Sequence, residues 1–150
     1  MKQVTFSIDF YTKLIGTILC GDFGTKPNNK IASFDLENTL IRTKSGCTFP
    51  KNVSDWTWWH ETVPKMLKEA HQDNYKIVIF TNQAGVKVGQ ITISDLRNKF
   101  VQIYNSLKIP FQFFCATKTD ENRKPGNGMW EYFINNQNGN KVIDLEASFF

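Results

Sequence analysis

Apolar and polar positions along the chain predict strands that alternate with helices. Residues 4–10 alternate strictly, the period of a half-buried strand, and 14–20 form a second apolar run, so we expect an N-terminal antiparallel hairpin. Continuous apolar runs, rich in branched and aromatic side chains, follow at 30–34, 76–80 and 111–116. Such runs are typical of parallel strands that are covered on both faces.

Two helices are expected between these strands. Apolar side chains recur at helical spacing from Asp55 to Asn74, where Ser54 or Asp55 can serve as the N-cap. A second run with the same period extends from Ser94 to Leu107. Strands that alternate with helices imply parallel pairing through right-handed crossovers.

The predicted fold is therefore α/β, with a mostly parallel Rossmann-like sheet, helices on both faces and antiparallel strands at the N-terminus. We expect one domain over residues 1–150, in which 1–29 form an N-terminal strand extension. The polar turn 135–140 precedes a last apolar run, 141–150. We expect this run to begin a core strand that stays incomplete at Phe150.

Composition narrows the class of protein. The chain has 150 residues, 41% of them apolar, which suits one ordinary core. Its net charge of +4 would favour a polyanion, although an ordinary solvated surface explains it equally well. Cys20, Cys47 and Cys115 lie far apart without CxxC spacing, which argues against a disulfide framework or a zinc site. Because no run approaches the roughly 18 apolar residues of a membrane span, we expect a soluble, intracellular, non-secreted protein.

Polar residues that can perform phosphate chemistry follow the predicted core strands. Asp35 and Glu37 come after the first strand, Thr81 and Asn82 end the second, and Lys124 follows the third. In open parallel sheets, ligands bind at these carboxyl ends. A carboxylate can attack a phosphoryl group, and a second carboxylate can protonate the leaving oxygen and then activate water.

A site with two carboxylates and a phosphate needs cations. Mg²⁺ with oxygen ligands and the ammonium of Lys124 are the candidates. Thr81 can donate its hydroxyl to a phosphoryl oxygen, and Asn82 can orient the substrate. Taken singly, the acidic pair is more often a turn or helix cap, Thr81 a strand-end cap and Lys124 a solvated side chain. The prediction depends on their order and on their placement at strand ends.

Short motifs in the same order resemble those of a known superfamily. FDLENTL at 34–40, IFTNQAG at 79–85 and RKP at 123–125 resemble the first three motifs of the haloacid dehalogenase (HAD) superfamily of aspartate-nucleophile phosphatases. From about Thr25 onward the chain is similar to the phosphatase domain of polynucleotide kinase 3′-phosphatase, a family that repairs DNA ends. The flanking segments that carry this similarity are TKSGCTFP (43–50), DWTWW (55–59), YKIVIFTNQAGV (75–86), IPFQFFCATKTD (109–120) and NRKPGNGMW (122–130).

The resemblance implies a role for each matching residue. Asp35 would be the nucleophile and a Mg²⁺ ligand, and Glu37 would be the acid/base and offer its backbone carbonyl to the metal. Thr81 and Lys124 match the positions that bind phosphate and stabilise charge. The candidates for substrate binding are Thr39, Arg42, Lys44, Ser45, Asn82 and Arg123.

The same resemblance implies the substrate and the setting. The family removes 3′-phosphates at DNA strand breaks through an aspartyl-phosphate and leaves a 3′-hydroxyl. We therefore expect Mg²⁺ as cofactor and DNA with 3′-phosphate ends as partner, together with DNA-repair proteins and no membrane. The location would be nuclear in a eukaryote and cytoplasmic otherwise.

The chain departs from the family pattern in two places. Glu37 stands where the family has Asp, and Asn38 stands where it usually has Gly. The extra methylene moves the carboxylate by roughly an ångström, a misplacement that can cost about 10²-fold in rate. In addition, the family's fourth motif, which completes the magnesium site, should begin just after a segment like 147–150, where this sequence ends.

Two other functions remain open on the sequence. The TNQ segment also occurs in HAD phosphatases that act on histidinol phosphate or sugar phosphates, although the zinc-binding loop common in those relatives is absent here. A non-catalytic nucleic-acid-binding protein would also fit Glu37 and the missing fourth motif. For Trp56, Trp58 and Trp59, we favour core packing over base stacking.

Overall fold

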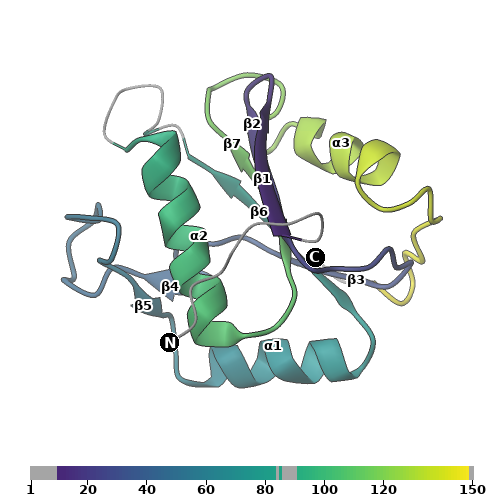
Figure 1. The fold of residues 1–150 in the computed structure, drawn as a ribbon, viewed down its shortest axis with the longest axis horizontal. Helices are drawn as coiled ribbons and strands as arrows, with labels where there is room; N and C mark the ends of the chain where they lie inside the picture. The colour runs from purple at the N-terminus through teal and green to yellow at the C-terminus, as the bar shows by residue number, and fades with distance from the viewer. Residues whose placement is uncertain (1–9, 84, 86–90, 149–150) are drawn as a thin grey trace.

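The structure is a computed structural model that describes residues 10–83, 85 and 91–148. A five-stranded sheet in the order β1-β2-β7-β6-β3 forms its centre, and β4 and β5 make a separate pair (Figure 1). The strands are β1 (Phe10–Ile15), β2 (Ile18–Phe23), β3 (Ile31–Phe34), β4 (Ile41–Arg42), β5 (Thr57–Trp58), β6 (Lys76–Asn82) and β7 (Gln112–Ala116). The helices are α1 (Thr62–Gln72), α2 (Ile93–Leu107) and α3 (Gly128–Asn136).

Each face of the sheet carries its own core. Alternate residues of β7 point to opposite faces, so Phe113 packs under α1 and α2 while Phe114 packs under α3. Phe113 stacks on Phe100 of α2 with ring centroids 3.8 Å apart, and Phe114 meets Phe133 of α3 edge-on at 5.8 Å. Helices on both faces confirm the predicted α/β class.

The parallel part of the sheet brings the predicted site strands together. β3 pairs in parallel with β6, and β6 pairs in parallel with β7. The carboxyl ends of these strands therefore lie at one edge of the sheet, as expected for an open α/β sheet. This pairing places the loop after Phe34 beside the segment that follows Phe80.

The N-terminal hairpin is present, but its strand boundaries differ from the predicted ones. β1 and β2 join through Gly16 and Thr17, so the turn falls inside the apolar run 14–20 that we read as one strand. Gly16 has a φ of 58°, the positive value that a two-residue hairpin loop with glycine first requires. Residues 4–9 of the other predicted strand lie outside the described residues. β2 also pairs antiparallel with β7, which makes the hairpin part of the main sheet; the assignment of 1–150 to one domain stays a prediction.

The first helix begins later than its apolar spacing suggested. α1 starts at Thr62, and the tryptophan-rich segment before it includes the short strand β5, which pairs with β4. The indole N–H groups of Trp56 and Trp58 donate to Gln102 and Ser106 of α2. These tryptophans therefore pack against another helix, and that tertiary contact overrides the local helical pattern. The second helix starts at Ile93, one residue before the prediction.

The last described segment does not form a strand. Residues 141–148 make turns and irregular structure, and 149–150 lie outside the described part. The segment contacts the start of β3, where Ile31 N–H donates to Ser148 Oγ at 2.8 Å, and Asp144 N–H donates to the Asn29 carbonyl at 2.8 Å. Within the described ranges, β3 has a strand partner on one side alone, and the core strand expected to begin in 141–150 is not observed. None of the described helices has the length and apolar character needed to cross a membrane.

Candidate active site

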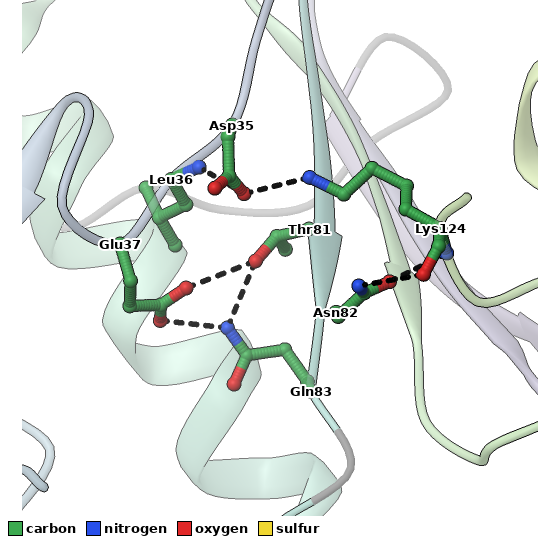
Figure 2. A network of polar contacts seen from close by, with 7 residues as sticks. All are labelled: Asp35, Leu36, Glu37, Thr81, Asn82, Gln83 and Lys124. Atoms are coloured by element: carbon green, nitrogen blue, oxygen red, sulfur yellow. Dashed lines mark hydrogen bonds and ion pairs between the residues drawn. The ribbon is translucent and has the colours of Figure 1, made fainter.

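Asp35 and Lys124 form the outer part of the candidate site (Figure 2). Asp35 follows β3 directly, and Lys124 lies in the loop between β7 and α3. Lys124 Nζ lies 2.8 Å from Asp35 Oδ1, which also accepts a hydrogen bond from Leu36 N–H at 2.9 Å. The side chains are 44% exposed for Asp35 and 36% exposed for Lys124. A solute can therefore reach both the carboxylate and the ammonium.

A tight loop after β3 sets the direction of both carboxylates. The carbonyl of Leu36 accepts hydrogen bonds from the N–H groups of Leu40 at 2.9 Å and Ile41 at 3.1 Å. The side chains of these three residues are buried and anchor the loop in the core. Asn38 has a φ of 59°, in the left-handed region that glycine adopts most readily and asparagine tolerates. This conformation suits asparagine as well as glycine, the residue that the resemblance implies at this position.

Two side chains donate hydrogen bonds to the carboxylate of Glu37, and a third, that of Lys99, forms an ion pair with it. Thr81 donates its hydroxyl to Glu37 Oε2 at 3.0 Å, and Gln83 donates its amide to Oε1 at 2.7 Å. Gln83 also donates to the Thr81 hydroxyl at 3.1 Å. Figure 2 shows the Glu37 side chain directed toward this pair, while Asp35 turns toward Lys124. The two carboxylates, two residues apart in sequence, therefore have different surroundings.

Lys99 is a residue of the site that the sequence reasoning missed. Its Nζ lies 3.6 Å from Glu37 Oε1, and its side chain is 4% exposed. Lys99 occupies the buried face of α2 together with Leu96 and Ile103. A lysine among the apolar positions of an amphipathic helix was the available signal, because buried lysines nearly always have a partner.

The side chain of Asn82 is hydrogen-bonded to the main chain of Lys124, and its expected role in orienting the substrate stays a prediction. Its side-chain oxygen accepts a hydrogen bond from Lys124 N–H at 2.9 Å, and its amide donates to the Lys124 carbonyl at 3.3 Å. Asn82 therefore grips the main chain of the catalytic candidate Lys124. The loop is also closely packed, since a Cβ on Gly126 would lie 2.2 Å from the Glu121 carbonyl oxygen. The structure brings together Asp35, Glu37, Thr81, Asn82 and Lys124, all predicted from sequence.

The other substrate-binding candidates lie around this centre. Thr39, Arg42 and Lys44 are exposed, and Arg123 is half-buried beside Lys124. Arg42 lines a cleft of about 390 Å³ together with Glu37, Lys99 and Trp56. Other residues of the 43–50 loop, which includes Ser45, also line this cleft.

Ser45 is engaged within the protein. Its hydroxyl donates to Asp55 Oδ2 at 2.7 Å and its N–H donates to Oδ1 at 2.8 Å. Lys51 N–H donates to Asp55 as well, at 2.9 Å. The hydrogen bond from Lys51, followed by that from the Ser45 hydroxyl, lowers the pKa of Asp55 to about 2. Ser45 therefore fastens the loop that walls the cleft.

Oxygen donors suited to a hard cation are present beside Asp35. Within the described ranges, Asp35 Oδ2 and the backbone carbonyl of Glu37 take part in no hydrogen bond. Carboxylate and carbonyl oxygens are the ligands that Mg²⁺ favours. The Glu37 carboxylate is occupied by Thr81, Gln83 and Lys99, so this residue fits a metal through its carbonyl rather than its side chain. Among the described residues, no group of three acidic, histidine or cysteine side chains is suited to hold a metal ion.

Sequence comparisons identify relatives of this chain. The family model described as polynucleotide kinase 3 phosphatase matches residues 30–150. The chain is 42% identical over 120 residues to a bifunctional polynucleotide phosphatase/kinase of Schizosaccharomyces pombe, covering 80% of this chain and 29% of that protein. It is 39% identical over 123 residues to an uncharacterised 20.8 kDa protein of Autographa californica nuclear polyhedrosis virus, covering 81% of this chain and 64% of that protein. A polynucleotide 3′-phosphatase of Arabidopsis thaliana is 27% identical over 143 residues, covering 86% of this chain and 20% of that protein.

The matched region is less than two thirds of the length of each of these three relatives. Solved structures agree on the fold. A D,D-heptose 1,7-bisphosphate phosphatase from B. bronchiseptica, complexed with magnesium and phosphate, has a TM-score of 0.62 at 18% identity and covers 70% of this chain and 62% of that one. A HAD-like phosphatase from Mesorhizobium loti has a TM-score of 0.68 at 14% identity and covers 88% and 68%. The predicted HAD-like fold is thereby confirmed.

Proposed function

This chain belongs to the polynucleotide kinase 3 phosphatase family, and on that premise we propose that it removes 3′-phosphate groups from polynucleotide ends. The observation that carries the proposal is the meeting of Asp35 with Lys124, 89 residues later in the chain, at the carboxyl end of a parallel strand. A nucleophilic carboxylate beside a cation is what transfer of a phosphoryl group to protein requires.

In the proposed reaction, the Asp35 carboxylate attacks phosphorus. The bond from phosphorus to Asp35 forms while the bond from phosphorus to the 3′ oxygen breaks. Lys124 stabilises the negative charge that spreads over the phosphoryl oxygens, and Leu36 N–H keeps the carboxylate oriented. Attack of water on the aspartyl-phosphate then releases phosphate and restores Asp35.

Glu37 would move the protons in both halves of the reaction. It would protonate the departing 3′ oxygen and later accept a proton from the attacking water. Thr81 and Gln83 fix the position of its carboxylate. Because the Thr81 hydroxyl is already donated to Glu37, a phosphoryl oxygen must replace that acceptor before Thr81 can bind phosphate.

Mg²⁺ is part of the proposal as a cofactor. Asp35 and the backbone carbonyl of Glu37 would hold it, since both present oxygen atoms without a hydrogen-bond partner in the described structure. When bound, the ion would supply positive charge that offsets the substrate phosphate. Further ligands would come from water and from the substrate phosphate itself.

A polynucleotide end is the substrate class we favour. The relatives from S. pombe and A. thaliana carry polynucleotide phosphatase in their names. The cleft beside Glu37 is lined by Arg42, a cation suited to the phosphates of a polynucleotide. We extend the proposal to 3′-phosphate ends at DNA strand breaks and to a role in DNA repair, in the nucleus if the protein is eukaryotic.

A phosphorylated metabolite is the second candidate substrate. A heptose-bisphosphate 7-phosphatase of Thermoplasma acidophilum is 29% identical over 108 residues, which cover 67% of this chain and 65% of that protein. The described residues of this chain lack a group of cysteine and histidine side chains suited to zinc. We therefore rank this substrate class below polynucleotide ends.

Phosphate release from matched substrates tests the proposal. The full chain is incubated with Mg²⁺ and either a 3′-phosphorylated nicked duplex, a 5′-phosphorylated control duplex or free sugar phosphates, with Asp35→Asn as the inactive control. We expect release from the 3′-phosphorylated duplex alone. Faster release from sugar phosphates would support the second candidate. Release no greater than with Asp35→Asn, together with salt-sensitive DNA binding, would indicate a non-catalytic binding protein.

A further inference from the structure

The loop that carries Lys124 is hydrogen-bonded to the N-terminal hairpin. This hairpin precedes residues 30–150, which the family model matches. The contact is made by the two-residue tip between β1 and β2, which meets residues 117–122 from about a hundred positions further along the chain. Figure 1 shows the β1–β2 tip beside the loop that leaves β7. The active-site loop is therefore supported from outside the recognised motifs.

Thr17 makes the contact through its side chain and its main chain. Its hydroxyl donates to Asp120 Oδ2 at 2.6 Å and accepts a hydrogen bond from Asn122 Nδ2 at 2.8 Å. Its carbonyl accepts from Thr117 N–H at 3.0 Å and from the Thr117 hydroxyl at 2.7 Å. The Thr17 hydroxyl is the largest cause of the lowered pKa of Asp120. That carboxylate therefore stays ionised and accepts a charge-assisted hydrogen bond.

Hydrogen bonds within the loop connect the Thr17 contact to the main chain next to Lys124. Asp120 Oδ1 accepts from Asn122 N–H at 3.0 Å, and the Asp120 carbonyl accepts from Arg123 N–H at 3.1 Å. The next residue is Lys124, whose main chain is held on the other side by Asn82. The loop is thus fixed at two points, and the ammonium of Lys124 lies 2.8 Å from Asp35 Oδ1.

The loop needs such anchors because its residues provide little apolar burial. Between Lys118 and Gly128, every side chain is polar, charged or absent except that of Pro125. Residues 118–128 are exposed or half-buried. Polar loops of this kind open locally at low cost unless hydrogen bonds hold them.

We propose that Thr17, at the tip of the N-terminal hairpin, is a positioning residue that holds the 117–124 loop so that Lys124 meets Asp35. Loss of its hydroxyl removes two hydrogen bonds from the loop while leaving the paired strands β1 and β2 in place. The loop then opens more often, and Lys124 spends less time beside the carboxylate.

Amide hydrogen exchange, followed by NMR on the full chain, tests this without requiring activity. Thr17→Val removes the hydroxyl and keeps the shape, and Thr17→Ser restores the hydroxyl. Thr25→Val is the matched control, because Thr25 also donates its hydroxyl to an aspartate of the N-terminal region, Asp22, at 2.7 Å. Amides of β6 report global unfolding, and those of Asn122 and Arg123 report opening of the loop.

In Thr17→Val, we expect the amides of Asn122 and Arg123 to exchange about tenfold faster than in the parent protein, because two hydrogen bonds are lost. This increase is counted after subtracting any change that the β6 amides show. Thr17→Ser and Thr25→Val should exchange at these positions as the parent does. Equal exchange in Thr17→Val and Thr25→Val would overturn the proposal. If Thr17→Val does not fold, Thr17→Ala takes its place with the same expected and opposing results.

A kinetic arm of the experiment rests on the proposed phosphatase function. Thr17→Val should lower kcat for a 3′-phosphorylated duplex about tenfold, and Thr17→Ser should restore it. An inactive parent protein would reject the phosphatase function, while the exchange rates would still decide the role of Thr17. An active Thr17→Val protein with unchanged kcat would reject the positioning role.

Discussion

Two lysine–carboxylate pairs stand side by side in the site and differ in almost every physical respect. Asp35 and Lys124 are 2.8 Å apart, and each is more than a third exposed. Glu37 and Lys99 are 3.6 Å apart, and the lysine is almost entirely buried. Both carboxylates are more than a third exposed, but Glu37 also accepts hydrogen bonds from Thr81 and Gln83, and its lysine partner lies on the buried face of α2.

This difference concerns how much each ion pair contributes to the stability of the fold. An exposed ion pair contributes little to stability, so its geometry is free to serve the reaction. A buried ammonium is costly without its counter-ion, so the second pair ties the position of Glu37 to the stability of the fold. The comparison can be tested by changing one member of each pair and measuring both rate and stability.

Shortening Glu37 should have the largest effect. Glu37→Asp restores the residue that the family has at this position and draws the carboxylate back by about one ångström, so we expect the rate of 3′-phosphate release to rise by up to about 10²-fold. Steady-state kinetics on the nicked duplex measure this. The matched change Asp35→Glu should abolish release. A lower rate for Glu37→Asp would mean that the site requires the longer side chain.

Removing the charge of Glu37 should destabilise the protein. Glu37→Gln leaves the Lys99 ammonium without its ion-pair partner, and we expect a loss of about 2 kcal/mol in the free energy of unfolding. The value lies below that for a fully buried pair because Glu37 is 37% exposed and solvent screens it. Urea denaturation provides the measurement.

Two further variants test whether the two ion pairs differ in their contribution to stability. The double variant Glu37→Gln with Lys99→Met should recover part of the loss, because it removes the orphaned charge. Asp35→Asn, at the exposed pair, should change the free energy of unfolding by less than about 1 kcal/mol. Equal losses for Glu37→Gln and Asp35→Asn would show that the two pairs do not differ as their burial indicates.

Loss of the Asn82 side chain should act on the exposed pair through Lys124. Asn82→Ala removes both hydrogen bonds to the Lys124 main chain, so we expect kcat for phosphate release to fall about tenfold. Asn98→Ala, at an exposed position on α2, is the control and should leave kcat unchanged. A fall in both variants would point to a general effect on the fold instead.

The smallest effect concerns the loop that walls the cleft beside Glu37. Because the folded protein lowers the pKa of Asp55 from 3.8 to about 2, this carboxylate stabilises the fold above about pH 4. That contribution is lost as the pH falls from about 4 to 2. Asp55→Asn should therefore lower the Tm at pH 7 and reduce the dependence of Tm on pH in this window. An identical acid dependence in both proteins would contradict the assignment.

Local sequence was enough to predict the parallel core strands and much of the candidate site. The apolar runs at β3, β6 and β7 have the length and composition of buried parallel strands, and the residues that follow them must meet at one sheet edge. Asp35, Thr81 and Lys124 could be assigned for this reason. The roles given to these residues remain proposals.

Local pattern failed where distant residues decide the conformation. The apolar spacing from Asp55 predicted a helix, but Trp56 and Trp58 pack on α2 instead, and the helix begins at Thr62. The run 14–20 was taken for one strand, but pairing of β2 with β7 as well as with β1 places a turn inside it. Propensity is a weak signal, and tertiary packing overrides it.

What the sequence by itself determined is the set of candidate reactive groups: a carboxylate pair, a threonine and a lysine, each at or after the carboxyl end of a core strand. The tertiary structure alone decided how they are held. In the folded chain, Lys99 is buried beside Glu37, and Asn82 is hydrogen-bonded to the main chain of Lys124. Thr17 is hydrogen-bonded to Asp120, which lies 103 positions further along the chain. The reason is physical: strand ends follow from local periodicity, whereas hydrogen bonds and ion pairs between distant residues exist only once the sheet has assembled.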